Sequence, residues 1–204
     1  MENLASENDL YGLVLAGGKS TRMNMDKSLL LYHGKTQVEY IFELLSVQCQ
    51  KVFVSNRQDQ KNLRGHGHLP QLHDLPEYSG IGPLGGIVSA LTQFPNAPWL
   101  VMACDLPFVT QETVEYLIER RNPQKIATAY ISAHDQLPEP LCAIWEPRAH
   151  LKILDFLKQG IQCPRKILIK SDIQLIEQKD KRWLDNANTP EEFQNALKAL
   201  QQKK

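Results

Sequence analysis

The sequence predicts an α/β fold, a three-layer α/β/α sandwich built around a mostly parallel sheet. Short apolar segments typical of strands alternate with longer amphipathic segments typical of helices along most of the 204 residues. Parallel strands need crossover connections, which are usually helices, so this alternation favours a parallel arrangement. No internal repeat, low-complexity segment or linker interrupts the pattern. We therefore expect one domain over residues 10–204.

The first third of the chain supplies two clear strands with a helix between them. The apolar segment 11–16 ends at two glycines and is predicted as a strand that enters a loop. Apolar side chains recur at helical spacing over 36–49, and Thr36 is the expected N-cap. A second strand is expected at 51–55, and the short apolar piece at 69–73 is the candidate for a third.

The middle of the chain continues the alternation. A loop at 74–82 leads into a helix at 83–94, which has a proline near its first turn. The segment 98–104 reads as a buried strand that ends at Asp105. A threonine cap and a glutamate in the first turn indicate a helix at 110–121.

The last third contains the remaining elements. Two strands are expected at 125–131 and 140–145, followed by a helix at 147–159 that begins at a proline. A further strand is expected at 172–177. The final helix spans 190–202, with a threonine as its cap and a proline at its first position.

Composition and charge exclude several classes of protein. Lysine plus arginine equals aspartate plus glutamate at 23 each, so the chain has no general attraction to nucleic acid or to anionic membranes. No apolar run approaches the ~20 residues that a membrane span requires. The acidic start, MENLASEND, lacks the features of a signal peptide. We expect a flexible tail at 1–9, a cytoplasmic protein, and neither a nucleic-acid nor a membrane partner.

Cysteine and histidine positions favour neither a zinc site nor a catalytic triad. The four cysteines show no CxxC spacing and no histidines cluster with them, so reduced thiols are the simpler interpretation. His73 and His134 each stand alone, without a serine or cysteine that would complete a nucleophilic arrangement.

The loop after the first strand, in LAGGKSTRMNMDK, is both rich in glycine and positively charged. Gly17 and Gly18 carry no side chain, so backbone N–H groups can approach a phosphate closely. Lys19, Arg22 and Lys27 add charge, and an arginine can hold two phosphate oxygens at once. The pattern is neither GxGxxG nor GxxxxGK[ST]. A phosphate cradle and a strand-to-helix turn with surface cations both fit these residues.

Asp105 directly follows the buried strand at 98–104. Ligands of open α/β sheets bind beyond the carboxyl ends of the strands, so we expect Asp105 and the glycine loop at the same edge. Mg²⁺ is held by one or two carboxylates together with phosphate oxygens. Asp105 is therefore a candidate Mg²⁺ ligand, with a turn or helix-cap role as the alternative. Asp74, after the third candidate strand, also has a turn role as its alternative.

Five short motifs resemble, in the same order, those of the MobA-like nucleotidyltransferase family, whose members make the dinucleotide forms of the molybdenum cofactor. They are LAGGKSTRMNMDK, Ser55-Asn56-Arg57, Asp74 with GIGPLGGIVSAL, ACDLPF around Asp105, and DNANTP at 185–190. The resemblance covers roughly residues 11–200, and it is greatest to the molybdenum cofactor guanylyltransferases.

The resemblance implies a single Rossmann-like domain of the nucleotide-diphospho-sugar transferase type, with a mostly parallel mixed sheet. It implies a Mg²⁺-dependent enzyme that transfers GMP from GTP to molybdenum-bound molybdopterin and releases pyrophosphate. It also implies transient contacts with other proteins of molybdenum cofactor biosynthesis and with the enzymes that receive the product.

The resemblance also assigns residues to the nucleotide. Leu15, Ala16, Gly17 and Gly18 would lie against GTP, and Lys27 would contact its phosphates. Lys27 is then one of three residues expected to take part in catalysis.

The other assignments concern the base, the metal and the acceptor. Asn56 and Asp74 would lie in the guanosine pocket, and Asn188 would lie in a motif that faces the pterin. Asp105 would bind Mg²⁺, and Arg22 would stabilise the leaving pyrophosphate. Asp105 and Arg22 complete the expected catalytic set.

One departure from the family pattern is Asn24, which stands where the family has a glycine after Arg-Met. Asparagine tolerates left-handed backbone better than most residues, so the turn can form. Three alternatives stay open. A CTP-dependent cytidylyltransferase of the same pterin usually has TAAGxSxRMG rather than LAGG. A sugar- or polyol-phosphate nucleotidyltransferase and a non-catalytic nucleotide-binding homologue are the other two.

Overall fold

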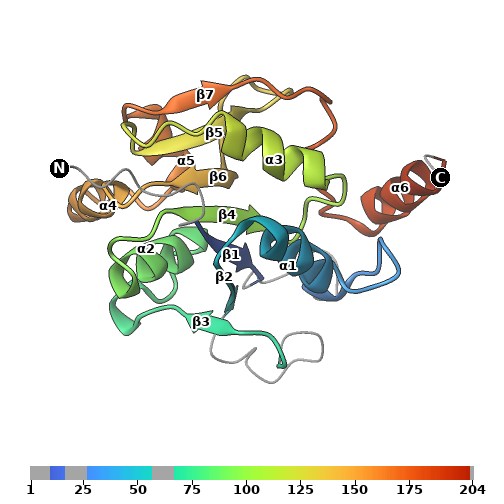
Figure 1. Cartoon of the computed structure of the whole chain (residues 1–204), viewed down its shortest axis with the longest axis horizontal. Coiled ribbons are helices and arrows are strands. Elements are labelled where there is room, and N and C mark those ends of the chain that lie inside the picture. Colours follow the sequence, from blue (N-terminus) through green and yellow to red (C-terminus); the bar gives the residue numbers. More distant parts are fainter. Residues whose placement is uncertain (1–9, 17–26, 57–66, 203–204) are drawn as a thin grey trace.

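The computed structural model describes residues 10–16, 27–56 and 67–202, except for the side chain of Lys27 (Figure 1). The centre of the described part is one seven-stranded sheet in the order β3-β2-β1-β4-β6-β5-β7. Its strands are β1 (Tyr11–Leu15), β2 (Lys51–Asn56), β3 (Gln71–His73), β4 (Trp99–Ala103), β5 (Ala127–Ile131), β6 (Pro138–Trp145) and β7 (Gln174–Ile176).

The sheet is mixed because β6 alone runs against its neighbours. β6 pairs antiparallel with both β4 and β5, whereas the pairs β1–β2, β1–β4, β2–β3 and β5–β7 are all parallel. The predicted α/β fold with a mostly parallel sheet is therefore confirmed.

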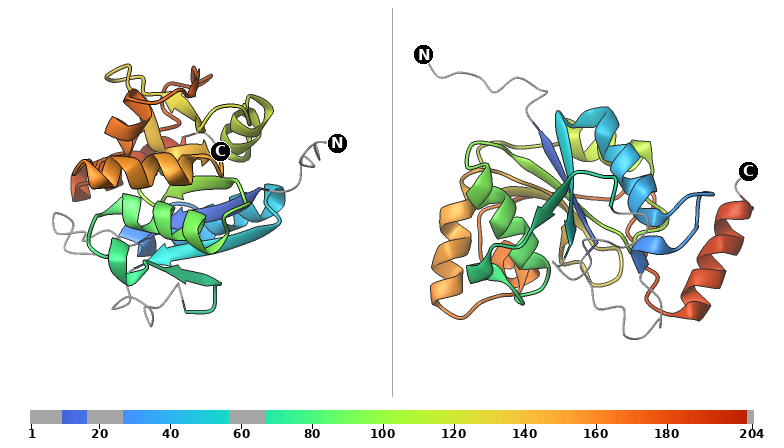
Figure 2. Two further views of the ribbon diagram at one scale, coloured as in Figure 1. Left: turned by 90° about the vertical axis from the view of Figure 1, so that its left-hand side faces the viewer. Right: turned by 90° about the horizontal axis from the view of Figure 1, so that it is seen from below.

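Helices cover both faces of the sheet (Figure 2). They are α1 (Gln37–Gln48), α2 (Pro83–Gln93), α3 (Gln111–Glu119), α4 (Ala149–Lys158), α5 (Pro164–Ile169) and α6 (Pro190–Gln201), with short 3-10 turns η1 (Lys27–Leu29) and η3 (Pro76–Tyr78). The apolar residues of α1 and α3 pack on one face and those of α2, α4 and α5 pack on the other. Helix α6 lies outside both layers and packs on Leu30 and Tyr32.

Capping residues begin the helices where the sequence predicts. Three helices begin with a capping box at a threonine: Thr36, Thr110 and Thr189. The threonine side chain accepts a hydrogen bond from the backbone N–H three residues later, and the side chain of that later residue accepts one from the backbone N–H of the threonine. These capping boxes satisfy N–H groups that a helix start leaves without an intrahelical partner.

The structure adds one helix and moves several predicted boundaries. The strands β3, β5 and β7 each begin two residues later than predicted, at Gln71, Ala127 and Gln174. The six-residue helix α5 was not expected, because it is too short to show a helical period. Helix α4 begins at Ala149 rather than at 147. Strand β6 begins at Pro138 rather than at 140, and Pro138 pairs with Ile131 beyond a register shift in β5. Proline is tolerated at the first residue of a strand, because the ladder needs no N–H from it there.

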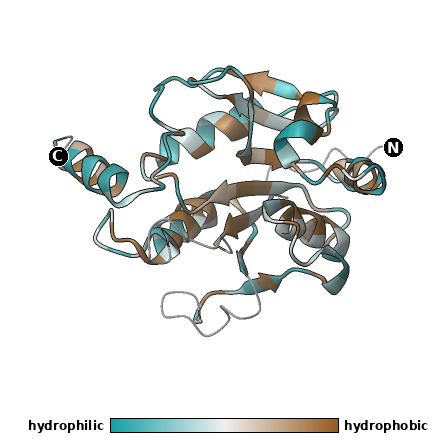
Figure 3. Cartoon of the chain, turned by 180° about the vertical axis from the view of Figure 1, so that it is seen from behind, coloured by the Kyte–Doolittle hydropathy of each residue, from teal (hydrophilic) through white to brown (hydrophobic). Residues whose placement is uncertain are grey.

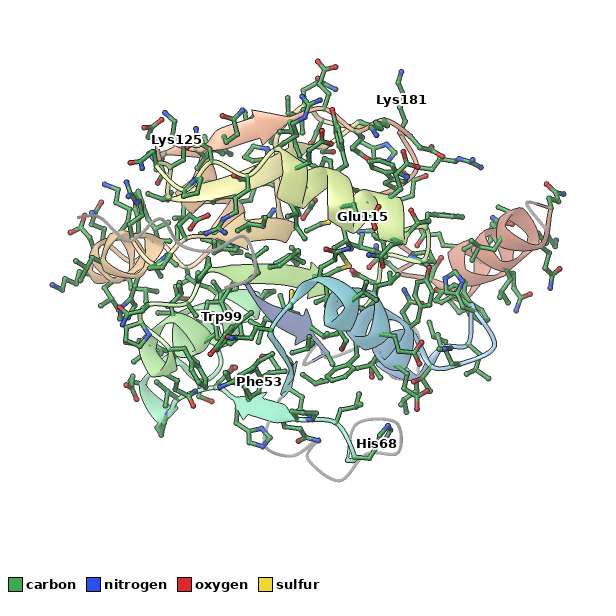
Figure 4. The ribbon with its side chains drawn as sticks, in the orientation of Figure 1. Phe53, His68, Trp99, Glu115, Lys125 and Lys181 are labelled. Carbon is green, nitrogen blue, oxygen red and sulfur yellow. The ribbon has the colours of Figure 1, made fainter. Side chains whose placement is uncertain are left out.

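The core lies on both sides of the central strands. All five residues of β4 are buried, as a strand covered on both faces requires. Figure 3 shows the same distribution as brown central strands with teal outer surfaces on the helices. Beside α2, the rings of Tyr11, Phe53, Phe94 and Trp99 form an aromatic cluster with centroids 5.4–6.5 Å apart; Phe53 and Trp99 are labelled in Figure 4.

Among the described residues, no helix has both the length and the apolar character that crossing a membrane would take.

Candidate active site

The carboxyl ends of β1, β2 and β4 meet at one edge of the sheet. Leu15 is in register with Ser55 of β2 and with Ala103 of β4. Beyond the strands, Ala16 N donates to Ser55 O at 2.8 Å, and Cys104 N donates to Leu15 O at 3.2 Å. Four predicted site residues therefore lie close together at this edge of the sheet: Leu15, Ala16, Asn56 and Asp105.

Asp74 joins the same edge through β3. His73 pairs in register with Asn56, and Asp74 is the next residue after that strand. The Asn56 side chain is buried and donates through Nδ2 to Gln71 Oε1 at 3.4 Å. Burial raises the pKa of the Asp74 carboxyl, and His73 opposes that rise. Asn56 and Asp74, which the resemblance assigns to one pocket, are thus neighbours.

The two adjacent glycines of α2 allow this helix to approach Asp74 and the strand ends. A Cβ at Gly85 would lie 2.8 Å from Asp74 Oδ2 and 2.6 Å from Tyr78 O. A Cβ at Gly86 would collide with Ser55 Oγ and lie 3.1 Å from Leu15 Cδ2. The GPLGG segment therefore fits here because it has no side chains at these two positions.

A further hydrogen bond fixes the chain after Asp74 to the same helix. Leu75 N donates to the hydroxyl of Ser89 at 2.8 Å, and Ser89 is fully buried in α2. Asp74 is thus held between a strand and a helix, rather than on an unsupported turn.

Asp105 follows β4 and is partly exposed. Its backbone oxygen accepts a hydrogen bond from Ala187 N at 3.0 Å, which ties the DNANTP segment to the end of β4. Asn188, predicted on the pterin side, is the next residue, and its N–H donates to Glu192 Oε2 at 2.6 Å. The structure therefore brings Asn188 to the Asp105 end of the sheet.

A partly buried charged group near Asp105 was not predicted from the sequence. Arg165, from α5, donates to Glu139 Oε2 at 2.7 Å and to Asp135 Oδ2 at 2.8 Å. The Glu139 side chain is only 17% exposed. Burial raises the pKa of Glu139 and the charge of Asp105 adds to the rise, while Arg165 opposes it.

The reversed direction of β6 brings Glu139 to this edge. Because β6 runs antiparallel to β4, the start of β6 lies beside the end of β4. A strand-opening glutamate between two prolines and an arginine on a short helix form no motif, so the sequence carried no local signal for this pair. His134, which stands alone in the sequence, contacts Asp185 Oδ1 through Nε2 at 2.8 Å, and so links the β5–β6 loop to the DNANTP segment.

The charge of Asp105 acts on side chains around it. Burial raises the pKa of the Tyr32 hydroxyl, and the negative charges of Asp105 and Glu192 raise it further. Within the described ranges, no three His, Cys, Asp or Glu side chains converge as a complete metal site. One or two carboxylates are what Mg²⁺ takes from a protein when phosphates and waters supply its other ligands. The single carboxylate of Asp105 is compatible with an ion of that kind, and Mg²⁺ at this position stays a prediction.

Several predicted residues lie outside the described part of the chain. These are Gly17, Gly18, Lys19, Arg22 and Asn24, together with the side chain of Lys27 and the predicted tail. Their assignments stay predictions. The chain leaves β1 at Ala16 and is described again from η1 onward.

A separate hollow of about 550 Å³ lies between α3 and β7. Tyr116, Arg120 and Leu175 are among its lining residues, and none of the predicted site residues lines it. The chemical groups that converge at the strand ends, rather than this hollow, define the candidate site.

Residues 12–175 match the family model described as the MobA-like NTP transferase domain. A "Molybdenum cofactor biosynthesis bifunctional protein" of Synechocystis sp. is 39% identical over 188 residues, which cover 92% of this chain and 54% of that protein. The chain therefore spans about half the length of that relative. A "Probable molybdenum cofactor guanylyltransferase" of Bacillus cereus is 32% identical over 195 residues, covering 93% of this chain and 96% of that protein.

Solved structures show the same architecture. The Molybdopterin-guanine dinucleotide biosynthesis protein A of Archaeoglobus fulgidus has a TM-score of 0.77 and 26% identity, covering 94% of this chain and 99% of that one. A CMP:2-keto-3-deoxy-manno-octonic acid synthetase complexed with CTP has a TM-score of 0.70 at 12% identity, covering 96% and 99%. At that identity the second likeness concerns the fold alone.

Proposed function

The chain belongs to the family of MobA-like NTP transferases and is a nucleotidyltransferase, and from this premise we propose that it is a Mg²⁺-dependent guanylyltransferase. It transfers GMP from GTP to the terminal phosphate of molybdenum-bound molybdopterin, forming molybdopterin guanine dinucleotide and releasing pyrophosphate. The observation that carries this proposal is the convergence of Leu15, Ala16, Asn56 and Asp105 at one edge of the sheet. The names of the curated relatives support the choice of substrates.

The nucleotide half of the proposed site lies at the ends of β1, β2 and β3. Ala16 begins the segment that would pass along the triphosphate, and Asn56 with Asp74 would hold the guanosine. An ionised Asp74 carboxylate can accept hydrogen bonds from N–H groups of a guanine base. Gly17, Gly18, Arg22 and Lys27 would supply amides and positive charge to the phosphates, as the resemblance implies.

The chemistry asks for positioning and charge neutralisation rather than a covalent intermediate on the protein. An oxygen of the acceptor phosphate attacks the α-phosphorus of GTP, and the bond to the β-phosphate breaks, so that pyrophosphate leaves with its electron pair. Asp105 would hold Mg²⁺, which supplies neutralising charge at the reacting phosphates. Arg22 would stabilise the leaving pyrophosphate, and Lys27 would orient the triphosphate.

The acceptor half of the proposed site lies beyond Asp105. Asn188 follows Ala187, whose backbone N–H donates a hydrogen bond to the backbone oxygen of Asp105. The Arg165 group borders the same edge from β6 and α5, and its two carboxylate partners hold the guanidinium in place.

One assay tests the proposal and separates its alternatives. The purified chain is incubated with Mg²⁺, molybdenum-bound molybdopterin and either GTP or CTP, and pyrophosphate release and the dinucleotide product are measured. Turnover with GTP is expected. Turnover with CTP alone would identify a cytidylyltransferase, and nucleotide binding without pyrophosphate release from either nucleotide would indicate a non-catalytic homologue.

A further inference from the structure

The backbone that follows Asp105 is held by three side chains from a single segment of the chain. Gln37 Nε2 donates to Leu106 O at 2.9 Å. The Tyr40 hydroxyl donates to Val109 O at 3.0 Å. His33 Nε2 lies 3.0 Å from Pro107 O, and because a carbonyl oxygen can only accept, this ring nitrogen carries the proton. We refer to His33, Gln37 and Tyr40 as the clamp.

The clamp is rigid. Gln37 and Tyr40 lie in the first turns of α1, which Thr36 and Glu39 cap reciprocally. The imidazole of His33 stacks on the ring of Tyr40, with centroids 3.7 Å apart and an angle of 17° between the planes. The stack joins His33, which precedes α1, to Tyr40 of the capped helix, so the three donors that reach the 106–109 backbone also support one another.

The buried amide of Gln37 costs stability as well as providing a bond. Its side chain is fully buried, and its Oε1 has no hydrogen-bond partner among the described residues. A buried amide oxygen without a partner is unfavourable, whereas an apolar side chain of similar length would fill the same volume without that penalty. Packing alone therefore does not explain a glutamine at this position, but the bond to Leu106 O does.

The clamp also connects two parts of the proposed site. Its segment follows η1, which is the first described element after the glycine loop. Gln37 N donates to Leu30 O at 2.8 Å, which ties the start of α1 to the residue after η1. The same glutamine thus bonds through its backbone to the nucleotide-side segment and through its side chain to the Asp105 side.

We propose that His33, Gln37 and Tyr40 are positioning residues, which set the place of the Asp105 carboxylate relative to the bound triphosphate by fixing residues 106–109. This inference rests on the proposed role of Asp105 as the Mg²⁺ ligand. Groups that orient a metal ligand typically change metal affinity or activity by about 10- to 100-fold when they are removed.

The test uses the full chain with Mn²⁺ as a spectroscopic probe in place of Mg²⁺. Gln37→Met removes the donor, keeps the volume and eliminates the unpartnered oxygen. Mn²⁺ binding in the presence of GTP is followed by electron paramagnetic resonance, and kcat and KM for GTP are measured at several Mg²⁺ concentrations. We expect Mn²⁺ affinity to fall about 10-fold, with lower kcat at limiting Mg²⁺, recovery at high Mg²⁺ and little change in KM or Tm.

A matched pair of tyrosine variants separates positioning from folding. Tyr40→Phe removes the bond to Val109 O but keeps the ring that stacks on His33. Tyr130→Phe removes an equivalent hydroxyl-to-backbone bond, to Thr113 O at 2.7 Å in the buried core. We expect Tyr40→Phe to weaken Mn²⁺ binding and Tyr130→Phe to lower Tm while leaving Mn²⁺ affinity unchanged.

Asp105→Ala distinguishes failure of this inference from failure of the proposed function. Loss of Mn²⁺ binding in Asp105→Ala, together with wild-type Mn²⁺ affinity in Gln37→Met and Tyr40→Phe, would overturn the clamp inference and leave the proposed function standing. Wild-type Mn²⁺ affinity in Asp105→Ala would overturn both. A loss of affinity in Gln37→Met that merely follows a fall in Tm would also overturn the clamp inference, since a structural role explains it.

Discussion

The amino and carboxyl ends of the same parallel strands differ in what they bring together. Near the amino ends of β1 and β4, Tyr11 and Trp99 pack with Phe53 and Phe94, and Trp99 is fully buried. At the carboxyl ends the chain instead places amides, carboxylates and glycines, and Asp105 stays partly exposed. One end thus stabilises the fold, while the other keeps polar groups available to a ligand.

The difference teaches that the carboxyl ends hold acidic groups in surroundings that disfavour their charge, whereas the amino ends hold packed aromatic rings. Burial raises the pKa of both Asp74 and Glu139, which means that the fold disfavours their charged forms. Substitutions at the two ends should therefore affect different measurements.

Asp105→Ala should reduce nucleotidyl transfer by about 10³-fold or more, because the charge of the metal at the reacting phosphates would be lost. Its Tm should stay within a few degrees of the wild type, since the side chain is partly exposed. The measurement is pyrophosphate release at saturating GTP and Mg²⁺, alongside thermal unfolding. A variant that keeps normal Mg²⁺-dependent turnover would refute the role of Asp105.

Trp99→Ala should lower stability and leave GTP binding unchanged. It empties the centre of the aromatic cluster and should lower the free energy of unfolding by about 3–5 kcal/mol. Denaturant unfolding gives this value, and calorimetry on the fraction that stays folded should give wild-type GTP affinity. Weakened GTP binding in the folded fraction would show that the two ends of the sheet are coupled.

Gly85→Ala should affect both properties, because the added Cβ meets Asp74 Oδ2 and Tyr78 O. We expect a loss of about 1–3 kcal/mol in stability and weaker GTP binding by calorimetry. Gly86→Ala is the comparison variant, since its Cβ meets Ser55 and Leu15 rather than Asp74. Equal GTP affinity in Gly85→Ala and the wild type would separate Asp74 from the nucleotide site.

Asp74→Asn should weaken GTP binding yet slightly stabilise the free protein near neutral pH. The raised pKa means that the folded state binds this proton more tightly than the unfolded chain does. The carboxyl group therefore favours folding below its unfolded pKa, and this contribution is lost as the pH rises through the folded pKa. Tm is measured for both proteins from about pH 3.5 to about pH 7, which begins near the ordinary pKa of an aspartate. As the pH rises, the Tm of Asp74→Asn should increase relative to that of the wild type. A constant difference in Tm over this range would contradict the prediction.

The layers and most helix starts could be predicted because their signals are local. Thr36 and Thr189 cap helices through bonds to residues three positions away, and β4 reads as a continuous apolar run. The converging strand ends follow from the parallel arrangement, which predicts Asp105 and the glycine loop at one edge of the sheet.

The remainder depends on contacts between distant parts of the chain. The bond from Gln37 to Leu106 and the ion pair of Arg165 with Glu139 join residues that no motif relates. The need for glycine at position 85 becomes visible only when Asp74 and Tyr78 are seen beside it. The roles predicted for Gly17, Gly18 and Arg22 stay predictions, because those residues lie outside the described part.

Because β6 runs in the opposite direction, the sheet contains two kinds of connection between neighbouring strands. The parallel strands β1 and β2 are joined through α1, and β3 leads to β4 through α2, whereas β5 and β6 are joined by a short turn. A turn of this kind can change length or composition without disturbing the crossovers. If the proposed site is correct, a change in the β5–β6 turn alters the surroundings of Asp105 while the connections of β1 and β2 stay as they are.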